Sequence, residues 1–87
     1  MKGNEGETMA KFVLCLYELE GEDFIAQYEL PGMRVEDARQ ILGQSPGDPM
    51  CDTYEVSSKS ELERLQRYTD HKIEIGKYAY FVEARQN

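Results

Sequence analysis

The sequence has no tryptophan, one histidine and only two cysteines among 87 residues. A zinc site needs three or four sulfur or imidazole ligands close together, and Cys15, Cys51 and His71 are too few and too dispersed to supply them. No glycine-rich phosphate-binding motif is present. No apolar run approaches the ~20 residues that cross a bilayer. We therefore expect no metal, no cofactor and no membrane-spanning segment.

Basic side chains are also scarce, with 10 lysines and arginines against 17 aspartates and glutamates and a net charge of −7. A field of this sign attracts cationic partners and repels nucleic acid and anionic membranes. Direct binding of nucleic acid is therefore not expected. The polar N-terminus lacks the apolar run of a signal peptide, which favours a cytoplasmic protein with free thiols.

The length predicts a flexible tail at 1–9 and a single domain at 10–87. Alternating runs at 11–20 and 24–30, joined by an acidic turn in which Gly21 would take a positive φ, predict a β-hairpin. Helical spacing predicts a helix at 35–42, capped by Gly43, and a helical segment at 57–68. Further strands are expected at 50–56 and 77–84. The pattern indicates an α+β domain: a four-stranded, mainly antiparallel sheet with a short helix packed on one face and the other face open.

Side chains alternate between the two faces of a strand, so the strand sequences also predict which residues face solvent. Tyr78, Tyr80 and Val82 can line a core, which leaves Phe81 beside Glu83 on the wet face. A large apolar ring among carboxylates is typical of an electrostatically steered interface, so we predict a basic protein partner. The predicted contact residues lie on the open face or at the hairpin turn: Cys15, Tyr17, Glu18, Glu20, Glu22, Cys51, Thr53, Glu55, Phe81 and Glu83.

Two blocks of sequence resemble the cloacin-type immunity proteins, which protect bacteria from their own ribosome-inactivating colicins. The first block spans residues 14–24 and has Tyr17 followed by Glu-Asp-Phe after the turn. The second is Leu-Gln-Arg-Tyr-Thr-Asp-His-Lys-Ile-Glu-Ile at 65–75, followed by Tyr-Phe-Val at 80–82. The sequence departs from the family at Leu16, which replaces an aromatic residue, and in the loop at 46–50. It also lacks a tryptophan that close relatives have before Leu65.

The resemblance implies an acidic, four-stranded domain whose exposed sheet face binds the basic C-terminal ribonuclease domain of a toxin, one to one. By position, Tyr17 and Phe81 match aromatic contacts of that family, and Cys51 matches a strand-three cysteine associated with specificity. The expected function is that of a stoichiometric inhibitor that is not an enzyme. The inhibitor would block the RNA-binding surface of the toxin.

Two other functions remain open. The chain could be an interaction adaptor unrelated to toxins, dimeric through the same sheet face, because such faces also mark homodimers. It could also be an enzyme that uses His71, alone or paired with a cysteine thiol. A lone histidine in Thr-Asp-His-Lys is more often a hydrogen-bonded turn residue, so catalysis is the weaker hypothesis.

Overall fold

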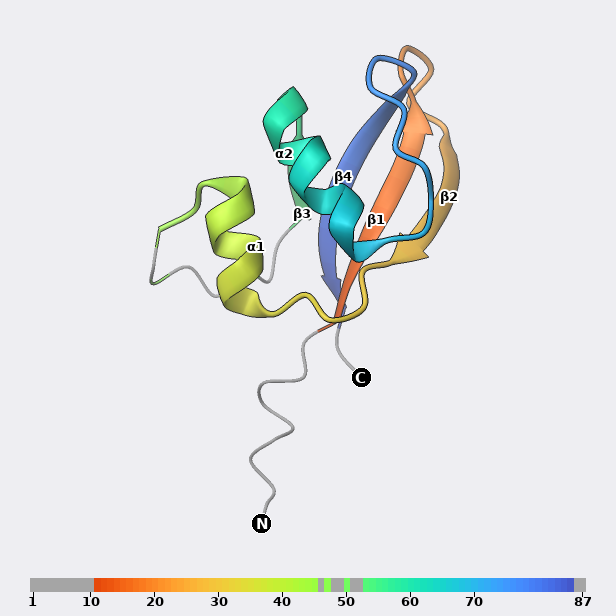
Figure 1. The fold of residues 1–87 in the computed structure, drawn as a ribbon. Coiled ribbons are helices and arrows are strands. Elements are labelled where there is room, and N and C mark those ends of the chain that lie inside the picture. The colour runs from red at the N-terminus through yellow and green to blue at the C-terminus, as the bar shows by residue number, and fades with distance from the viewer. Residues whose placement is uncertain (1–10, 46, 48–49, 51–52, 86–87) are drawn as a thin grey trace.

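The computed structural model describes residues 11–45, 47, 50 and 53–85, and the predicted tail at 1–9 lies outside them. In chain order the elements are β1 (Lys11–Glu18), β2 (Phe24–Glu29), α1 (Val35–Leu42), β3 (Thr53–Val56), α2 (Lys59–Leu65), a 3-10 turn (Gln66–Tyr68) and β4 (Tyr78–Arg85). The strands form one antiparallel sheet in the order β2-β1-β4-β3 (Figure 1). The predicted α+β class and the four-stranded sheet are confirmed.

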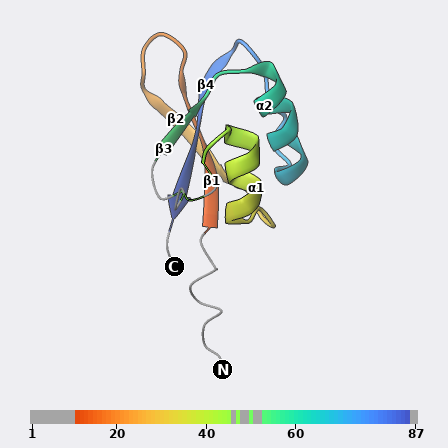
Figure 2. The ribbon, with the colours of Figure 1, turned by 90° about the vertical axis from the view of Figure 1, so that its left-hand side faces the viewer.

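Two short helices, rather than one, cover one face of this sheet. Figure 2 shows α1 and α2 on the same side of the strands. Each helix buries an apolar stripe at helical spacing, as an amphipathic helix must. These stripes pack with the inward side chains of β1 and β4 into one core, which includes Leu14, Leu16, Ala38, Ile41, Leu42, Leu62, Leu65, Tyr80 and Val82.

The helix boundaries follow from local sequence. The Ser58 side chain accepts a hydrogen bond from the Glu61 backbone N–H at 3.1 Å. In return, the Glu61 carboxylate accepts a hydrogen bond from the Ser58 backbone N–H. This capping box fixes the start of α2. Helix α1 has the predicted bounds and ends at Gly43, whose φ of 67° lies in the left-handed region that glycine tolerates. No helix in the described part of the chain is long and apolar enough to span a bilayer.

The hairpin turn differs from its prediction. Strand β1 ends at Glu18, not Glu20, because the Glu18 N–H donates to the Asp23 carbonyl at 2.8 Å and closes the turn early. The positive φ of the turn lies at Glu22, at 64°, and not at Gly21. The Glu18 carboxylate lies against Gly21, so a side chain at that position would displace this exposed carboxylate. The ends of β2 and β4 differ from prediction by one residue, and the segment at 57–68 divides into α2 and the 3-10 turn.

A β-bulge in the hairpin changes the face of one aromatic residue. Leu16 pairs with Ala26, but Tyr17 pairs with Phe24, so Ile25 is the extra residue. Strict alternation would place Phe24 on the same face as Tyr28. The bulge reverses that parity and puts Phe24 beside Tyr17 on the face without helices, as bulges do when they redirect a side chain.

Candidate functional site

The face of the sheet opposite the helices is the candidate site, and the strand register assembles it from four separate segments. Cys15 pairs with Phe81, and Phe81 with Glu55, so these three side chains cross β1, β4 and β3 in one row. Val13, Glu83 and Thr53 form the next row in the same way. Directly paired residues of antiparallel strands share a face. The sheet therefore brings Cys15, Tyr17, Thr53, Glu55, Phe81 and Glu83 together, while Cys51 lies outside the described residues.

Three aromatic rings form a contiguous cluster on this face. The Tyr17 ring lies 5.6 Å from that of Phe24 and 5.3 Å from that of Phe81, edge to face in both cases. Tyr17 and Phe81 are half-buried, and Phe24 is 55% exposed. We call Tyr17, Phe24 and Phe81 the ring cluster. The contact residues predicted from the sequence do not include Phe24. Two adjacent apolar residues, Phe24 and Ile25, interrupt the alternation of β2 and are the sequence signal for the bulge that places Phe24 on this face.

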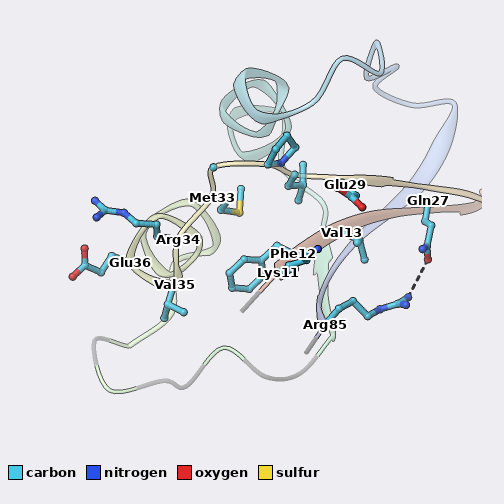
Figure 3. Close-up of a pocket in the computed structure, with 13 residues that line it drawn as sticks. Lys11, Phe12, Val13, Gln27, Glu29, Met33, Arg34, Val35, Glu36 and Arg85 are labelled. Atoms are coloured by element: carbon cyan, nitrogen blue, oxygen red, sulfur yellow. Dashed lines mark hydrogen bonds between the residues drawn. The ribbon is translucent and has the colours of Figure 1, made fainter. Parts of the chain in front are cut away.

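Arg85 lies over part of the open face. Its guanidinium pairs with the Glu83 carboxylate at 2.8 Å and donates to the Gln27 side chain at 3.0 Å, which links β4 to β2 across β1 (Figure 3). Cys15, on the intervening strand, is only 1% exposed. Burial raises the pKa of the Cys15 thiol, and the charge of Glu83 adds to the rise, while Arg85 opposes it. The predicted contact Cys15 is thus on the expected face but beneath other side chains, and Glu83 already holds a cation.

The other four carboxylates of the predicted contact set differ from Glu83 in exposure and pairing. Glu18, Glu20, Glu22 and Glu55 are exposed. Within the described residues none of these four carboxylates forms an ion pair. Their charge is therefore available to an external cation, whereas that of Glu83 is neutralised internally.

A hollow of about 530 Å³ lies between the ring cluster and the end of the hairpin. It opens at Ala79, which pairs with Tyr17 and carries only a methyl group. The lining combines rings, carboxylates and small side chains: Tyr17, Glu18, Leu19, Glu22, Thr53, Glu55, Ala79 and Phe81. Six of these eight residues belong to the predicted contact set, and sequence reasoning did not include Leu19 and Ala79.

A wider hollow of about 1000 Å³ opens at the other end of the sheet, between β1, β2 and the segment that leads into α1 (Figure 3). Its lining includes Lys11, Phe12, Glu29, Met33 and Arg85. No histidine, cysteine, serine or threonine is among the described residues that line it. It therefore presents no nucleophile–base pair of the kind that covalent catalysis needs.

His71 lies on the helix side of the sheet. Its ring stacks on Tyr28 with centroids 4.3 Å apart, and its Nε2 lies 3.4 Å from the Tyr80 hydroxyl. Cys15 points to the opposite face, so the sheet separates the two groups and they cannot form a thiol–imidazole pair. Among the described residues, no group of three or more His, Cys, Asp or Glu side chains is placed to hold a metal ion.

Residues 11–83 match a protein family described as a domain of unknown function, DUF7683. The chain belongs to this family. No curated protein and no solved structure matches the sequence. The DUF7683 match covers all four strands and both helices except the last two residues of β4, so it includes the open face and the hollow.

In this DUF7683 domain, the block at 65–75 has a structural role. The Gln66 side chain donates to the carbonyls of Thr69 and His71 at 3.2 and 2.8 Å and accepts from the Ile73 N–H at 2.9 Å. The Tyr80 hydroxyl accepts from the Glu74 N–H at 2.8 Å. Burial raises the pKa of Tyr80, which keeps the hydroxyl protonated. These bonds hold the loop before β4 and therefore support the fold rather than a binding surface.

Proposed function

We propose that this DUF7683 domain is a bacterial immunity protein that binds a basic nuclease toxin, one to one, and neutralises it. The observation that carries the proposal is the ring cluster, set among carboxylates that have no internal cation. An exposed Phe24 and two half-buried rings beside Glu18, Glu22 and Glu55 combine an apolar anchor with a charged rim, which is how tight interfaces are built. The sequence resemblance to cloacin-type immunity proteins supports the same reading.

The distribution of charge supports a cationic partner on this side of the molecule. The strands and the hairpin turn carry two basic groups, Lys11 and Arg85, against seven acidic ones: Glu18, Glu20, Glu22, Asp23, Glu29, Glu55 and Glu83. The helices, with the residue before α1, carry four acidic groups against five basic ones: Arg34, Arg39, Lys59, Arg64 and Arg67. The strands with the hairpin turn thus have a net charge of −5, and the helices with Arg34 have one of +1. A basic protein is attracted to the sheet side and an anionic polymer is repelled from it.

Inhibition in this proposal is occlusion. The sheet face covers the cationic surface through which the nuclease, most simply a ribonuclease, holds its RNA. The carboxylates accelerate encounter and the ring cluster slows dissociation. No group on the face takes part in a chemical step. The complex forms in the cytoplasm of the cell that makes the toxin, and no cofactor is involved.

Growth rescue tests the proposal. A reading frame next to that of this chain that encodes a large protein with a lysine-rich nuclease tail identifies the candidate toxin. We expect co-expression of this chain to restore growth to cells that express the tail, and purification to yield a one-to-one complex. Nuclease tails from other bacteria are the specificity control. Failure to bind or protect against the neighbouring tail contradicts the proposal.

The alternative is an adaptor that dimerises through the same face. Two copies placed face to face would oppose two surfaces of the same negative sign, which costs free energy. Sedimentation of the free protein separates the two functions, because the immunity function requires at most weak self-association. A tight dimer that Phe81→Ala dissociates would favour the adaptor.

A further inference from the structure

We propose that the hollow at Ala79 is the receptor for one arginine side chain of the partner. The inference rests on the proposed function for the source of the arginine, but the chemistry of the hollow can be tested without a toxin.

The shape of the hollow comes from the register. On the open face Ala79 lies next to Tyr17 on β1 and two positions from Phe81 along β4. Strand β3 ends at Val56, the partner of Tyr80, so no strand residue lies beside Ala79 on that side. The Ala79 methyl group, beside the larger side chains of Tyr17 and Phe81 and with no strand residue on its other side, leaves a depression.

The charge of the hollow is arranged on two sides. Glu18, at the end of β1, and Glu22, in the hairpin turn, line one side of the hollow, and Glu55 on β3 lines the other. Strands β1 and β3 flank β4, so they lie about two strand spacings apart, or roughly 10 Å. Within the described part of the chain all three carboxylates lack an ion-pair partner. A cation that enters between them can meet carboxylates on both sides.

The rings select the kind of cation. Tyr17 and Phe81 both line the hollow with their planes 83° apart, so a planar group meets aromatic surface on more than one side. A guanidinium is planar, stacks on aromatic rings and donates in a fork that matches a carboxylate. An ammonium group is compact and strongly hydrated, so it loses more on entering such a site. The lining therefore favours arginine over lysine.

Titration with short peptides provides the test. The probes are the blocked tripeptides Gly-Arg-Gly and Gly-Lys-Gly, and the readout is the backbone amide spectrum of the ¹⁵N-labelled chain at low salt. We expect the arginine peptide to shift the amides of Tyr17, Glu55, Ala79 and Phe81 and to bind several-fold more tightly than the lysine peptide. Equal affinities for the two peptides would overturn the inference. So would amide shifts spread over all residues with exposed carboxylates.

Substitutions locate the site. Ala79→Leu fills the hollow and should weaken binding of the arginine peptide at least tenfold, whereas Ala79→Ser keeps it open and should bind as the native chain does. Glu55→Gln should weaken binding of the arginine peptide without changing the shape of the hollow. This variant tests the inference even if Ala79→Leu does not fold. Glu63→Gln, an exposed carboxylate on α2, is the matched control and should have no effect. Unchanged binding by both Glu55→Gln and a folded Ala79→Leu overturns the inference.

The two proposals fail in different ways. If the arginine peptide binds in the hollow but the chain protects against no nuclease, the proposed function is wrong and the arginine site stands. If the chain protects and Phe81→Ala weakens the complex, but Ala79→Leu binds the nuclease with native affinity, the function stands and the arginine site is wrong.

Discussion

Phe81 is the side chain on which the proposed interface depends most. It pairs with Cys15 on one side and Glu55 on the other, contacts the Tyr17 ring, and lines the hollow. A ring near the centre of a contact surface, flanked by other rings and surrounded by charge, has the position of a binding hot spot. Its removal should therefore affect the complex more than the fold.

The first prediction is that Phe81→Ala weakens toxin binding by about 2 kcal/mol or more, the loss expected for a hot-spot aromatic residue. Isothermal titration against the cognate nuclease domain measures this loss. Tyr78→Ala is the matched control, because Tyr78 is also half-buried on β4 but points to the helix side. It should lower stability and leave the affinity of the folded protein nearly unchanged. Equal affinity losses for the two variants would remove Phe81 from the site.

Cys15 behaves differently, because burial raises its pKa above the usual 9.0. The Cys15 thiol in the native state then keeps its proton at a pH where the thiol of the unfolded chain loses it. The free energy of unfolding is therefore highest below about pH 9 and falls as pH rises further. One such group contributes a fall of up to ~1.4 kcal/mol per pH unit. The raised pKa of Tyr80 adds a similar loss above about pH 10.

The second prediction concerns this alkaline loss. Urea unfolding between pH 8 and 10 should show a falling free energy of unfolding in the native chain and a flatter profile in Cys15→Ala. The variant loses packing at every pH, so the slope, not the absolute stability, is the readout. Parallel profiles for the two proteins would show that the thiol does not contribute to the fall.

At the scale of elements, the loop between the 3-10 turn and β4 is held by Gln66. Its side-chain amide makes hydrogen bonds to Thr69, His71 and Ile73, and Tyr80 anchors the next residue. The loop fixes the point at which β4 enters the sheet, and β4 carries Ala79 and Phe81. A side chain far from the open face thus positions the residues on it.

The third prediction is that Gln66→Ala destabilises the fold by about 2–3 kcal/mol, since three part-buried hydrogen bonds are lost at ~0.5–1.5 kcal/mol each. Chemical denaturation measures the change. Arg67→Ala, at the adjacent exposed position, is the control and should cost less than about 0.5 kcal/mol. A Gln66→Ala variant as stable as the native chain would mean that water replaces all three bonds.

At the scale of the whole molecule, the charge is distributed unevenly between the two layers. The excess negative charge of the described residues lies on the strands and the hairpin turn, while the helices are close to neutral. In the proposed complex, the field of this asymmetric charge would orient the cationic partner toward the open face before contact.

The fourth prediction is that association with the nuclease slows about tenfold or more as salt rises from ~20 to ~500 mM, since screening removes the steering, while dissociation changes much less. Stopped-flow kinetics measures both rates. The double variant Glu20→Gln/Glu22→Gln should associate more slowly at low salt than Glu36→Gln/Glu63→Gln, which removes the same charge from the helix layer. Identical rates for the two double variants would show that net charge alone matters.

The sequence by itself determined the element types, the α+β class and the face on which most candidate residues lie. Hydrophobic alternation and helical spacing are local properties, so Val35–Leu42 and the core face of β4 can be read without knowledge of neighbours. The parity of Cys15, Tyr17, Glu55 and Phe81 follows from the same rule. The second helical segment was also visible from its capping box.

Only the tertiary structure decided which of these residues a partner can touch. The bulge that moves Phe24 to the open face depends on pairing with β1, and the hollow at Ala79 exists because β3 ends one pair before it. Cys15 is buried between its partners on the flanking strands, Gln27 on β2 and Phe81 on β4, and the bond from Arg85 to Gln27 joins residues 58 positions apart. Exposure and pairing arise from atoms that are distant in sequence, so alternation within a single strand cannot determine them.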